Sequence, residues 1–312
     1  MAEPVAIAAL VLDAAIGWPR SLHARLGHPV GFFAAMIGLC ERHGNRPRWT
    51  DGARRLAGVG TLVLLLGVAI GGAGLLQFLA YRWLGSYGWA GVALLAWPAL
   101  AQRSLFDHVR PVARYLGQGE TEKARRAVSM IVGRDTRSLD EPAIARAAIE
   151  SLSESFCDGV VAPLFWMIVG GLPGIWAYKA VNTADSLIGH KEERWRAFGW
   201  ASARTDDAMN FLPARLAGPL ICLAGAGGWR IMLRDARNHA SPNAGWTEAA
   251  MAGALGLRLA GPVSYDGVPH DKPWIGEGDR PASARDISRA LRVYLRACVL
   301  LWLVAAAAQF AA

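Results

Sequence analysis

The feature that most constrains this chain is one uninterrupted apolar run. Residues 56–80 read L-A-G-V-G-T-L-V-L-L-L-G-V-A-I-G-G-A-G-L-L-Q-F-L-A, 25 positions without a charged side chain. About 20 apolar residues in a helix are enough to cross the hydrocarbon core of a bilayer. A buried helix in a soluble core is the alternative, but uncharged runs of this length are typical of membrane spans. The run therefore predicts an integral membrane protein.

Apolar residues are gathered in runs along the whole chain. The chain has 312 residues, of which 53% are hydrophobic. Apolar segments lie at about 4–16, 29–40, 56–82, 88–101, 159–179, 208–228 and 293–311, and polar regions with a helical pattern lie at 102–158, 180–207 and 229–290. These runs predict an all-α, multi-pass membrane protein with roughly four to six spans. We expect a single membrane-embedded domain over residues 1–312.

The basic residues indicate how the chain is oriented. The formal net charge is +8, and the arginines lie between apolar runs instead of forming one basic arm, so no nucleic acid partner is expected. The loop after the second run holds Arg42, Arg46, Arg48, Arg54 and Arg55. Such loops stay on the cytoplasmic side, facing anionic lipid. We therefore expect a protein of the cell (inner) membrane, in contact with the lipid bilayer. The four cysteines form no C-x-x-C pair, so neither a zinc site nor a disulfide framework is expected.

One apolar segment does not read as a simple span. In residues 159–181 the stretch G-G-L-P-G at 170–174 interrupts the apolar sequence. Glycine and proline there break a helix. A full crossing would also place the basic 180–207 region outside, against the positive-inside tendency. We predict a broken or re-entrant helix, whose non-helical backbone must be shielded by protein or line a cavity.

An acidic row lies just before this segment. In L-D-E-P at 139–142, Asp140 can cap a helix and Pro142 is tolerated in its first turn, so a helix is expected to run to about Phe156. Three acidic residues follow at intervals of four, namely Glu150, Glu154 and Asp158. On one helical face their charges repel unless a cation lies among them. The row predicts a site for Mg²⁺ or a cationic substrate; a solvated acidic face is the alternative.

The stretch Y-K-A-V-N-T-A-D-S-L-I-G-H-K at 178–191 places many polar groups after the broken segment. The candidates are Asn182, Thr183, Asp185, Ser186, His190 and Lys191. We predict that they line the cavity that the broken helix requires. In the alternative, Asn182 and Thr183 cap a following helix, which would explain one or two of these residues but not all.

A third cluster is A-R-T-D-D-A-M-N-F-L-P-A-R at 203–215. One helical face can present the carboxylates of Asp206 and Asp207 with the amide of Asn210 to a metal–phosphate complex. Arg204 and Arg215 flank it, and arginine forks bind phosphate or carboxylate. An Arg–Asp surface pair is the alternative. Ionisable groups at a membrane boundary are usually functional, which favours a site.

Two further patterns are weaker. V-G-R-D-T at 132–136, with Arg134, is a turn too short for a phosphate loop, and neither G-x-x-x-x-G-K-[ST] nor G-x-G-x-x-G occurs. P-N-A-G-W-T-E-A-A-M-A-G at 242–253 begins as a loop and continues as a small-residue helix, which predicts close helix packing.

Taken in order, these motifs resemble a known family. The joined pattern is G-R-D-T…E-S-L-S-E-S-F-C-D-G-V-V-A-P-L-F-W…Y-K-A-V-N-T-A-D-S-L-I-G-H-K…A-R-T-D-D-A-M-N-F-L-P-A-R…N-A-G-W-T-E-A-A-M-A-G-A-L-G, preceded by L-D-A-A-I-G-W-P-R…H-P-V-G. It resembles the adenosylcobinamide-phosphate synthases of cobalamin biosynthesis (the CobD/CbiB type) over nearly the whole chain. Ser155 and Leu187 depart from that pattern, and neither change removes a charged candidate.

The resemblance implies an activity. Family members are multi-pass membrane enzymes that join (R)-1-amino-2-propanol, or its O-phosphate, to a propionate carboxyl of adenosylcobyric acid in an ATP-driven amide ligation. The implied co-reactants are ATP and Mg²⁺. The implied partners are adenosylcobyric acid, aminopropanol phosphate or ethanolamine phosphate, and other membrane enzymes of late cobalamin assembly. The implied enzyme is an acid–amine ligase that yields adenosylcobinamide or its phosphate.

The candidate residues fit this chemistry as a hypothesis. Mg²⁺ and nucleotide are assigned to Glu150, Glu154 and Asp158 with Asp206 and Asp207; the catalytic groups to Asp185, His190, Lys191, Asp206 and Asp207; and substrate binding to Arg134, Asn182, Thr183, Ser186, Arg204, Asn210 and Arg215. Carboxylates, arginines and lysines would together offset repulsion between anionic reactants, and Asp185 or His190 could accept the amine proton. These segments are expected to meet in one pocket.

Three other functions are compatible with a polar membrane protein. A transporter of an anionic or corrinoid substrate also uses broken helices, but we see no internal repeat. A membrane phosphotransferase with a D-D-x-x-N metal site has no need for the 182–191 cluster. The third alternative is a non-catalytic membrane sensor related to the family.

Overall fold

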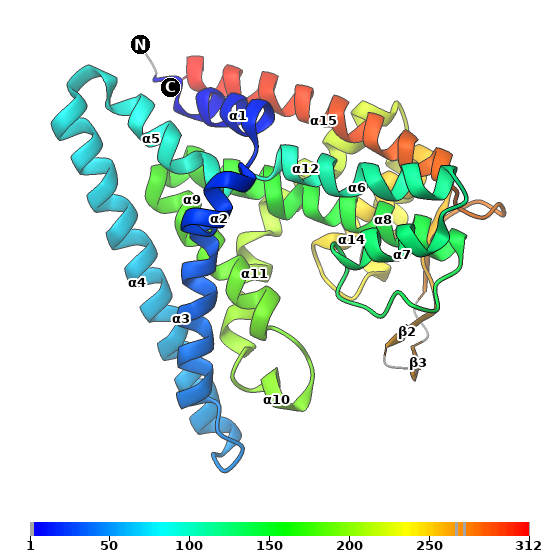
Figure 1. Ribbon diagram of the computed structural model, residues 1–312, viewed down its shortest axis with the longest axis horizontal. Helices are drawn as coiled ribbons and strands as arrows, with labels where there is room; N and C mark the ends of the chain where they lie inside the picture. Colours follow the sequence, from blue (N-terminus) through cyan, green and yellow to red (C-terminus); the bar gives the residue numbers. More distant parts are fainter. Residues whose placement is uncertain (1–2, 266–267, 271–272, 312) are drawn as a thin grey trace. The chain divides into compact units, whose positions relative to one another are not determined.

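The protein is almost entirely helical and divides into two compact units. The computed structural model describes residues 3–265, 268–270 and 273–311. The first unit comprises residues 1–101, 162–210 and 305–312, and the second comprises 102–161 and 211–304. Figure 1 colours the chain from its N-terminus to its C-terminus, so that the interleaving of the two units along the sequence can be followed.

Several helices are long and apolar enough to cross a membrane. In the described part of the chain, three such spans lie within Asp51–Gly117, Glu141–Ile188 and Ala284–Ala308. A fourth becomes possible when the bent pair Trp200–Met209 and Phe211–Gly225 is counted as one span. The predicted all-α, multi-pass architecture is therefore confirmed.

The first unit is built on a long helix. Its elements are α1 (Val5–Ile16), α2 (Arg20–Leu26), α3 (Pro29–Gly44), α4 (Asp51–Leu84), α5 (Gly88–Ala96), α9 (Ala162–Ile188), α10 (Glu193–Arg196) and α11 (Trp200–Met209), with short 3₁₀ turns at Gly85–Tyr87 and Trp97–Ala99. Thr50 caps α4, because its hydroxyl accepts a hydrogen bond from the Ala53 amide at 3.3 Å. The uncharged run 56–80 lies wholly within α4, as predicted.

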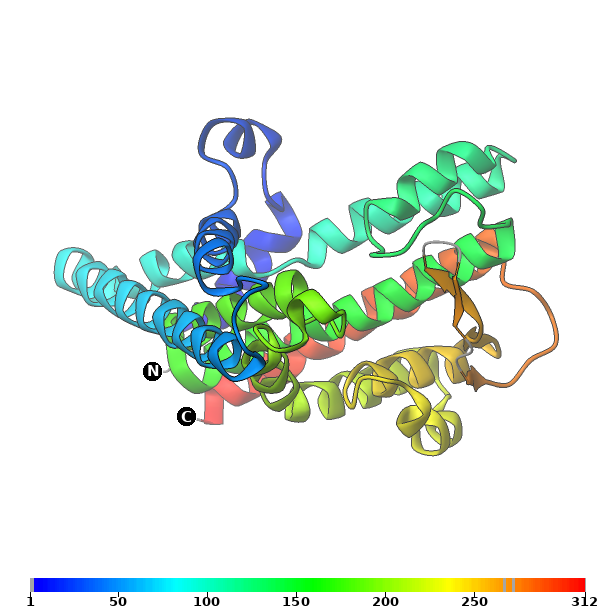
Figure 2. The same ribbon diagram turned by 90° about the horizontal axis from the view of Figure 1, so that it is seen from below.

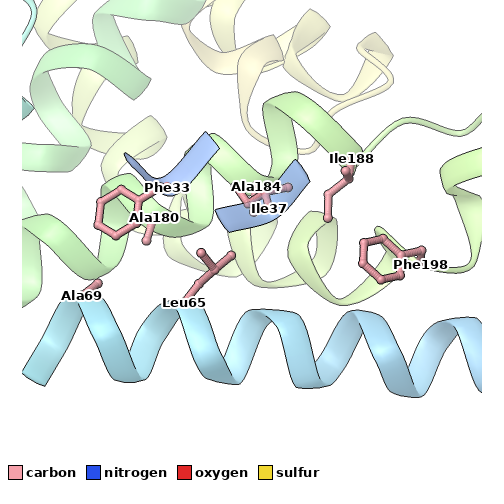
Figure 3. Packing of buried hydrophobic residues seen from close by; sticks show 8 residues of the cluster. All are labelled: Phe33, Ile37, Leu65, Ala69, Ala180, Ala184, Ile188 and Phe198. Atoms are coloured by element: carbon pink, nitrogen blue, oxygen red, sulfur yellow. The ribbon is translucent and has the colours of Figure 1, made fainter. Parts of the chain in front are cut away.

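Small residues let α9 pack closely against α3 and α4. Figure 3 shows the buried cluster, which consists of Phe33, Ile37, Leu65, Ala69, Ala180, Ala184, Ile188 and Phe198. The two alanines of α9 face the larger side chains, so the helix backbones come close. Within a bilayer, helices associate mainly through such tight van der Waals packing. This packing fixes the last turns of α9, where the polar residues lie.

α9 is broken where the sequence predicts it. Gly171 has φ 61° and ψ −150°, a conformation that side chains rarely adopt. The Leu172 amide donates instead to the side-chain oxygen of Gln77 on α4 at 2.9 Å. In a straight helix, residues eight positions apart such as Trp166 and Gly174 are separated by about 12 Å. Here a Cβ at Gly174 would overlap the carbonyl oxygen of Trp166. The bend is therefore sharp, and a protein side chain satisfies the freed backbone.

The second unit packs helices around α8 and α15. Its elements are α6 (Gln102–Gly117), α7 (Thr121–Ser129), α8 (Glu141–Phe156), a π-helical stretch (Cys157–Val161), α12 (Phe211–Gly225), α13 (Trp229–Asp235), the 3₁₀ turn Ala236–Asn238, α14 (Ala244–Leu255) and α15 (Ala284–Ala311, to residue 304 in this unit). Figure 2 shows α8 alongside α15. Phe156 of α8 meets Tyr294 of α15 edge-on, with ring centroids 5.7 Å apart. The Tyr294 hydroxyl donates to the Gln102 carbonyl of α6 at 2.8 Å.

Two local predictions are confirmed in this unit. The Asp140 side chain accepts a hydrogen bond from the Ala143 amide at 2.9 Å at the start of α8, and the helix ends at Phe156. Residues 244–253 of the small-residue segment lie in α14, after a loop, and α14 packs closely on α12 and α13. A Cβ at Gly253 would lie 2.6 Å from the Gly228 Cα, so only glycine permits this approach.

The region 229–290 is less helical than predicted. Residues Arg258–Ala260 (β1) pair with Trp274–Gly276 (β4), and Val263–Tyr265 (β2) with Val268–His270 (β3), both antiparallel. Prolines at 262, 269 and 273 stop helix propagation here. Gly261, at φ 77°, leaves no space for a Cβ beside the Trp274 ring. The difference from the prediction is limited to these short strands, and the all-α class holds.

Candidate functional site

The first unit contains a buried polar network between α9 and α11. The Asp206 carboxylate is 8% exposed and accepts hydrogen bonds from two amides, Asn182 Nδ2 at 3.3 Å and Asn210 Nδ2 at 2.9 Å. The buried Tyr178 hydroxyl donates to Asn210 Oδ1 at 2.9 Å. The donors thus run from Tyr178 through Asn210 to Asp206. Such chains orient a carboxylate in a dry site.

A cation lies beside this network. Lys179, in the apolar helix α9, acts electrostatically on Asp206. A buried carboxylate is costly unless it is paired and hydrogen-bonded. The two amides and the lysine charge offset part of the cost of burying the Asp206 carboxylate. Neither Lys179 nor Tyr178 was among the site residues predicted from the sequence, although a lysine within an apolar segment is itself a signal of function.

Asp207 differs from its neighbour in being half-exposed. Its carboxylate lies 3.7 Å from the Arg204 guanidinium, and the two side chains are 32% and 70% exposed. The Lys191 charge also acts on it. Surface pairs of this kind stabilise little. The alternative of an Arg–Asp surface pair therefore describes Asp207 but not the buried Asp206.

The predicted cluster at 182–191 is split by the end of α9. The helix continues to Ile188, so the alternative in which Asn182 and Thr183 cap a following helix is wrong. The Thr183 hydroxyl donates to the Lys179 carbonyl at 2.6 Å, and the Ser186 hydroxyl to the Asn182 carbonyl at 2.8 Å. These two hydroxyls bond to their own helix, whereas the Asn182 amide reaches Asp206.

The remaining residues of the cluster surround Gly189. A Cβ there would overlap the Asp185 carboxylate, so the glycine allows that side chain to fold over the helix end. His190 and Lys191 follow the helix and are exposed. The His190 ring lies 5.4 Å from that of Trp195. Asp185, His190 and Lys191 therefore form the solvent side of the candidate site.

The second unit contains the acidic row. Glu150 Oε2 accepts from Arg134 at 2.8 Å and Oε1 from the Ala260 amide at 2.8 Å, and both side chains of the ion pair are 14% exposed. Glu154 is exposed, and Asp158 lies in the π-helical stretch, so the row does not continue as a regular α-helix. Stretches of π-helix are frequent at functional sites.

The fit to a resident metal is poor. Across the described residues, no three His, Cys, Asp or Glu side chains are placed to hold an ion together. To bind a metal, Glu150 would have to exchange a protein donor for the cation. The metal assignment to Glu150, Glu154 and Asp158 stays a prediction, as does the meeting of the two sets of candidates in one pocket.

The Arg215 guanidinium lies over two aromatic rings. Its guanidinium carbon lies 3.5 Å from the Phe211 ring centroid and 4.9 Å from that of Trp246. One guanidinium nitrogen, Nη1, donates to the Phe211 carbonyl at 2.7 Å and to Asn243 Oδ1 at 3.3 Å. The two ring contacts and the two hydrogen bonds restrict the guanidinium, and a restricted guanidinium is suited to bind an anion.

Comparison with known proteins decides the family. A model of the CobD/Cbib protein family matches residues 6–294. The chain belongs to the CobD/Cbib family. The cobalamin biosynthesis protein CobD of Rhodobacter capsulatus is 48% identical over 305 residues, which cover 96% of this chain and 94% of the relative. No solved structure matches the chain.

Other relatives carry the same name. The cobalamin biosynthesis protein CobD of a Sinorhizobium species is 50% identical over 303 residues, covering 94% of each chain. That of Geobacter metallireducens is 44% identical over 319 residues, covering 98% of this chain and 96% of the relative. The match along almost the full length confirms the predicted CobD/Cbib membership. The candidate residues of both units lie inside the matched range.

Proposed function

We propose that this CobD/Cbib protein acts in cobalamin biosynthesis as an ATP-dependent amide ligase. It would join (R)-1-amino-2-propanol O-phosphate, or the free amino-alcohol, to the propionate carboxyl of adenosylcobyric acid. Family membership supports a role in cobalamin biosynthesis, because relatives that match nearly the whole chain are named cobalamin biosynthesis proteins. The buried network of Asp206 supports the presence of an active site.

The chemistry requires two transfers. A carboxylate oxygen of adenosylcobyric acid attacks the γ-phosphorus of ATP, ADP leaves, and an acyl phosphate forms. The amine then attacks the acyl carbon, inorganic phosphate leaves, and the nitrogen loses a proton. Positive groups must offset repulsion between the anions in the first transfer. Arg204 and Lys191, which flank Asp207, are proposed for this role.

The amine proton needs an acceptor within reach. Asp185 and His190 lie at the solvent side of the network, next to Gly189. A proton taken there can pass directly to water. Asp206 is proposed to hold the substrate amine or its hydroxyl through the carboxylate that Asn182 and Asn210 orient.

We propose that Mg²⁺ arrives with ATP instead of occupying a resident site. Magnesium bound to a nucleotide takes phosphate and water oxygens and needs only one or two protein carboxylates. Asp207, half-exposed and next to Asp206, can supply one of them. The acidic row of the second unit is a second candidate source of a carboxylate for the nucleotide-bound Mg²⁺.

The proposed location is the cytoplasmic side of the cell membrane. The arginines of residues 42–55 lie at the end of α3 and the start of α4, and Arg194 of α10 lies beside them, because it pairs with Glu41 at 2.8 Å. The positive-inside tendency supports a cytoplasmic position for this end, where ATP is available. Other membrane enzymes of late cobalamin assembly are proposed as neighbours.

A direct ligation assay tests this function. Detergent-purified protein is incubated with adenosylcobyric acid, ATP and Mg²⁺ and, in separate arms, aminopropanol phosphate, aminopropanol and ethanolamine phosphate. We expect a product with the mass of the amide and one ADP per product. Substrate binding without product in every arm would favour a transporter or sensor. Near-normal turnover in both Asp206→Asn and Asp185→Asn would remove the residue assignment.

A further inference from the structure

The N-terminal part of the first unit contains the same turn twice. Gly17-Trp18-Pro19 separates α1 from α2, and Gly27-His28-Pro29 separates α2 from α3. The two glycines have φ of 61° and 69°, which ends each helix sharply. A residue that precedes proline is kept out of the helical conformation. The repeated G-x-P turn thus holds one ring, of Trp18 or of His28, at each turn.

The two rings meet, and one nitrogen is left unsatisfied. The Trp18 and His28 ring centroids are 4.9 Å apart, edge to face, and Trp97 lies 5.7 Å from Trp18. Trp97 Nε1 donates to the Gly17 carbonyl at 3.1 Å. In the described part of the chain, Trp18 Nε1 is enclosed and has no acceptor. Enclosed donors nearly always have a partner, so this one points to an acceptor that comes from outside the protein.

His28 offers a second donor. Its Nδ1 accepts a hydrogen bond from the Val30 amide at 3.2 Å, so in the neutral ring the proton is on Nε2. Burial, followed by the electrostatic effects of Lys179 and His23, lowers the pKa of His28 from 6.5 to about 4. The ring is therefore neutral near pH 7 and keeps its Nε2 proton. Lys179 of α9 acts on the ring electrostatically, which brings a basic side chain of that helix into its surroundings.

We propose that Trp18, His28 and Lys179 form a receptor for an anionic oxygen, of a carboxylate or a phosphate group. The Nε1–H of Trp18 and the Nε2–H of His28 donate to the oxygen, and the Lys179 ammonium supplies the opposite charge. Lys179 also acts electrostatically on Asp206 of the buried network. That the anion belongs to adenosylcobyric acid or aminopropanol phosphate rests on the proposed function, whereas the receptor itself does not.

The indole signal of Trp18 tests the receptor directly. The full-length protein, ¹⁵N-labelled at its 13 tryptophans, is titrated in micelles with inorganic phosphate at constant ionic strength. Trp18→Phe identifies the signal. We expect its indole proton to move downfield saturably with phosphate and not with chloride. Trp97→Phe is the matched control, because that N–H is already bonded to Gly17, and the Trp18 shift should persist in it.

Affinity measurements separate the possible sources of the anion. Inorganic phosphate, aminopropanol phosphate, adenosylcobyric acid and vesicles of phosphatidylglycerol are compared by calorimetry. We expect Trp18→Phe and His28→Asn each to lower the affinity for the preferred ligand by about 10- to 100-fold, which corresponds to the loss of one hydrogen bond to a charged acceptor. Asparagine keeps an acceptor for the Val30 amide, so this variant tests the idea even where Trp18→Phe does not fold.

The outcomes distinguish the receptor from the proposed function. An unmoved Trp18 signal with every ligand, a shift equally produced by chloride, or wild-type affinity in folded variants overturns the receptor. A phosphate-dependent shift in a protein that makes no amide leaves the receptor standing and removes the ligase function. Tightest binding to lipid vesicles assigns the receptor to a phospholipid headgroup, and tightest binding to a soluble anion assigns it to a substrate.

Discussion

The hydroxyl of Tyr178 should matter for both stability and turnover. It donates to Asn210 Oδ1 at 2.9 Å in a buried site. Tyr178→Phe removes this bond without changing the ring. The amide cannot compensate by flipping, because Asn210 Nδ2 donates to Asp206 at 2.9 Å and a flip would bring two oxygens together. Loss of a bond of this kind costs about 1–2 kcal/mol, or a midpoint decrease on the order of 2–4 °C.

Turnover should fall because Asn210 orients Asp206. We expect kcat to decrease about tenfold, equivalent to about 1.4 kcal/mol, with little change in KM. Tyr294→Phe is the matched control, since it removes a buried hydroxyl that donates at 2.8 Å to the Gln102 carbonyl in the second unit. It should destabilise the protein similarly and leave kcat unchanged. Equal kcat losses in the two variants, at equal folded fraction, would refute the orienting role of Tyr178.

Three further perturbations test other parts of the account. Gly174→Ala should destabilise the protein by about 3 kcal/mol, because its Cβ overlaps a backbone carbonyl, while Gly170→Ala, with open space around it, should be nearly neutral in thermal unfolding. Glu150→Gln should lower stability by about 1–3 kcal/mol by removing the charge that pairs with Arg134. The Mg²⁺ concentration for half-maximal ligation should stay unchanged in this variant. A higher Mg²⁺ requirement would instead support a metal role for Glu150. The pKa of His28 is about 4 in the folded protein and near 6.5 in the unfolded chain. The neutral ring therefore contributes to the stability of the folded protein above pH 6.5, and this contribution is lost as the pH falls towards 4. The difference in melting midpoint between wild type and His28→Asn, measured in detergent, should therefore shrink as the pH falls from 6.5 to 4. Midpoints that change in parallel with pH in the two proteins would contradict this expectation.

Much of the fold follows from local sequence patterns. The uncharged run predicts α4, the Asp140 and Pro142 pair predicts the start of α8, and the G-G-L-P-G stretch predicts the break in α9. Each of these depends on residues close together in the chain. The strands at 258–276 were not predicted, because they are only three residues long and depend on pairing between segments.

The candidate site was predicted as a set of residues but not as a network. Asn182, Asp206 and Asn210 were all candidates, and the structure bonds them together. Tyr178 was not, because its contact with Asn210 joins positions 32 apart that only the packing of α9 on α11 brings together. An isolated tyrosine at the end of an apolar run reads as an interfacial anchor. The predicted grouping with the acidic row of the second unit stays a prediction.

A single-turnover assay decides whether the buried carboxylate of Asp206 serves an amide ligation. Wild type and Asp206→Asn, both shown to be folded by their melting curves, are each mixed with adenosylcobyric acid, aminopropanol phosphate, ATP and Mg²⁺, and the corrinoid product is weighed by mass spectrometry. We expect amide in the wild-type reaction and at least a hundredfold less in the variant. Equal amounts of product from both proteins would contradict it.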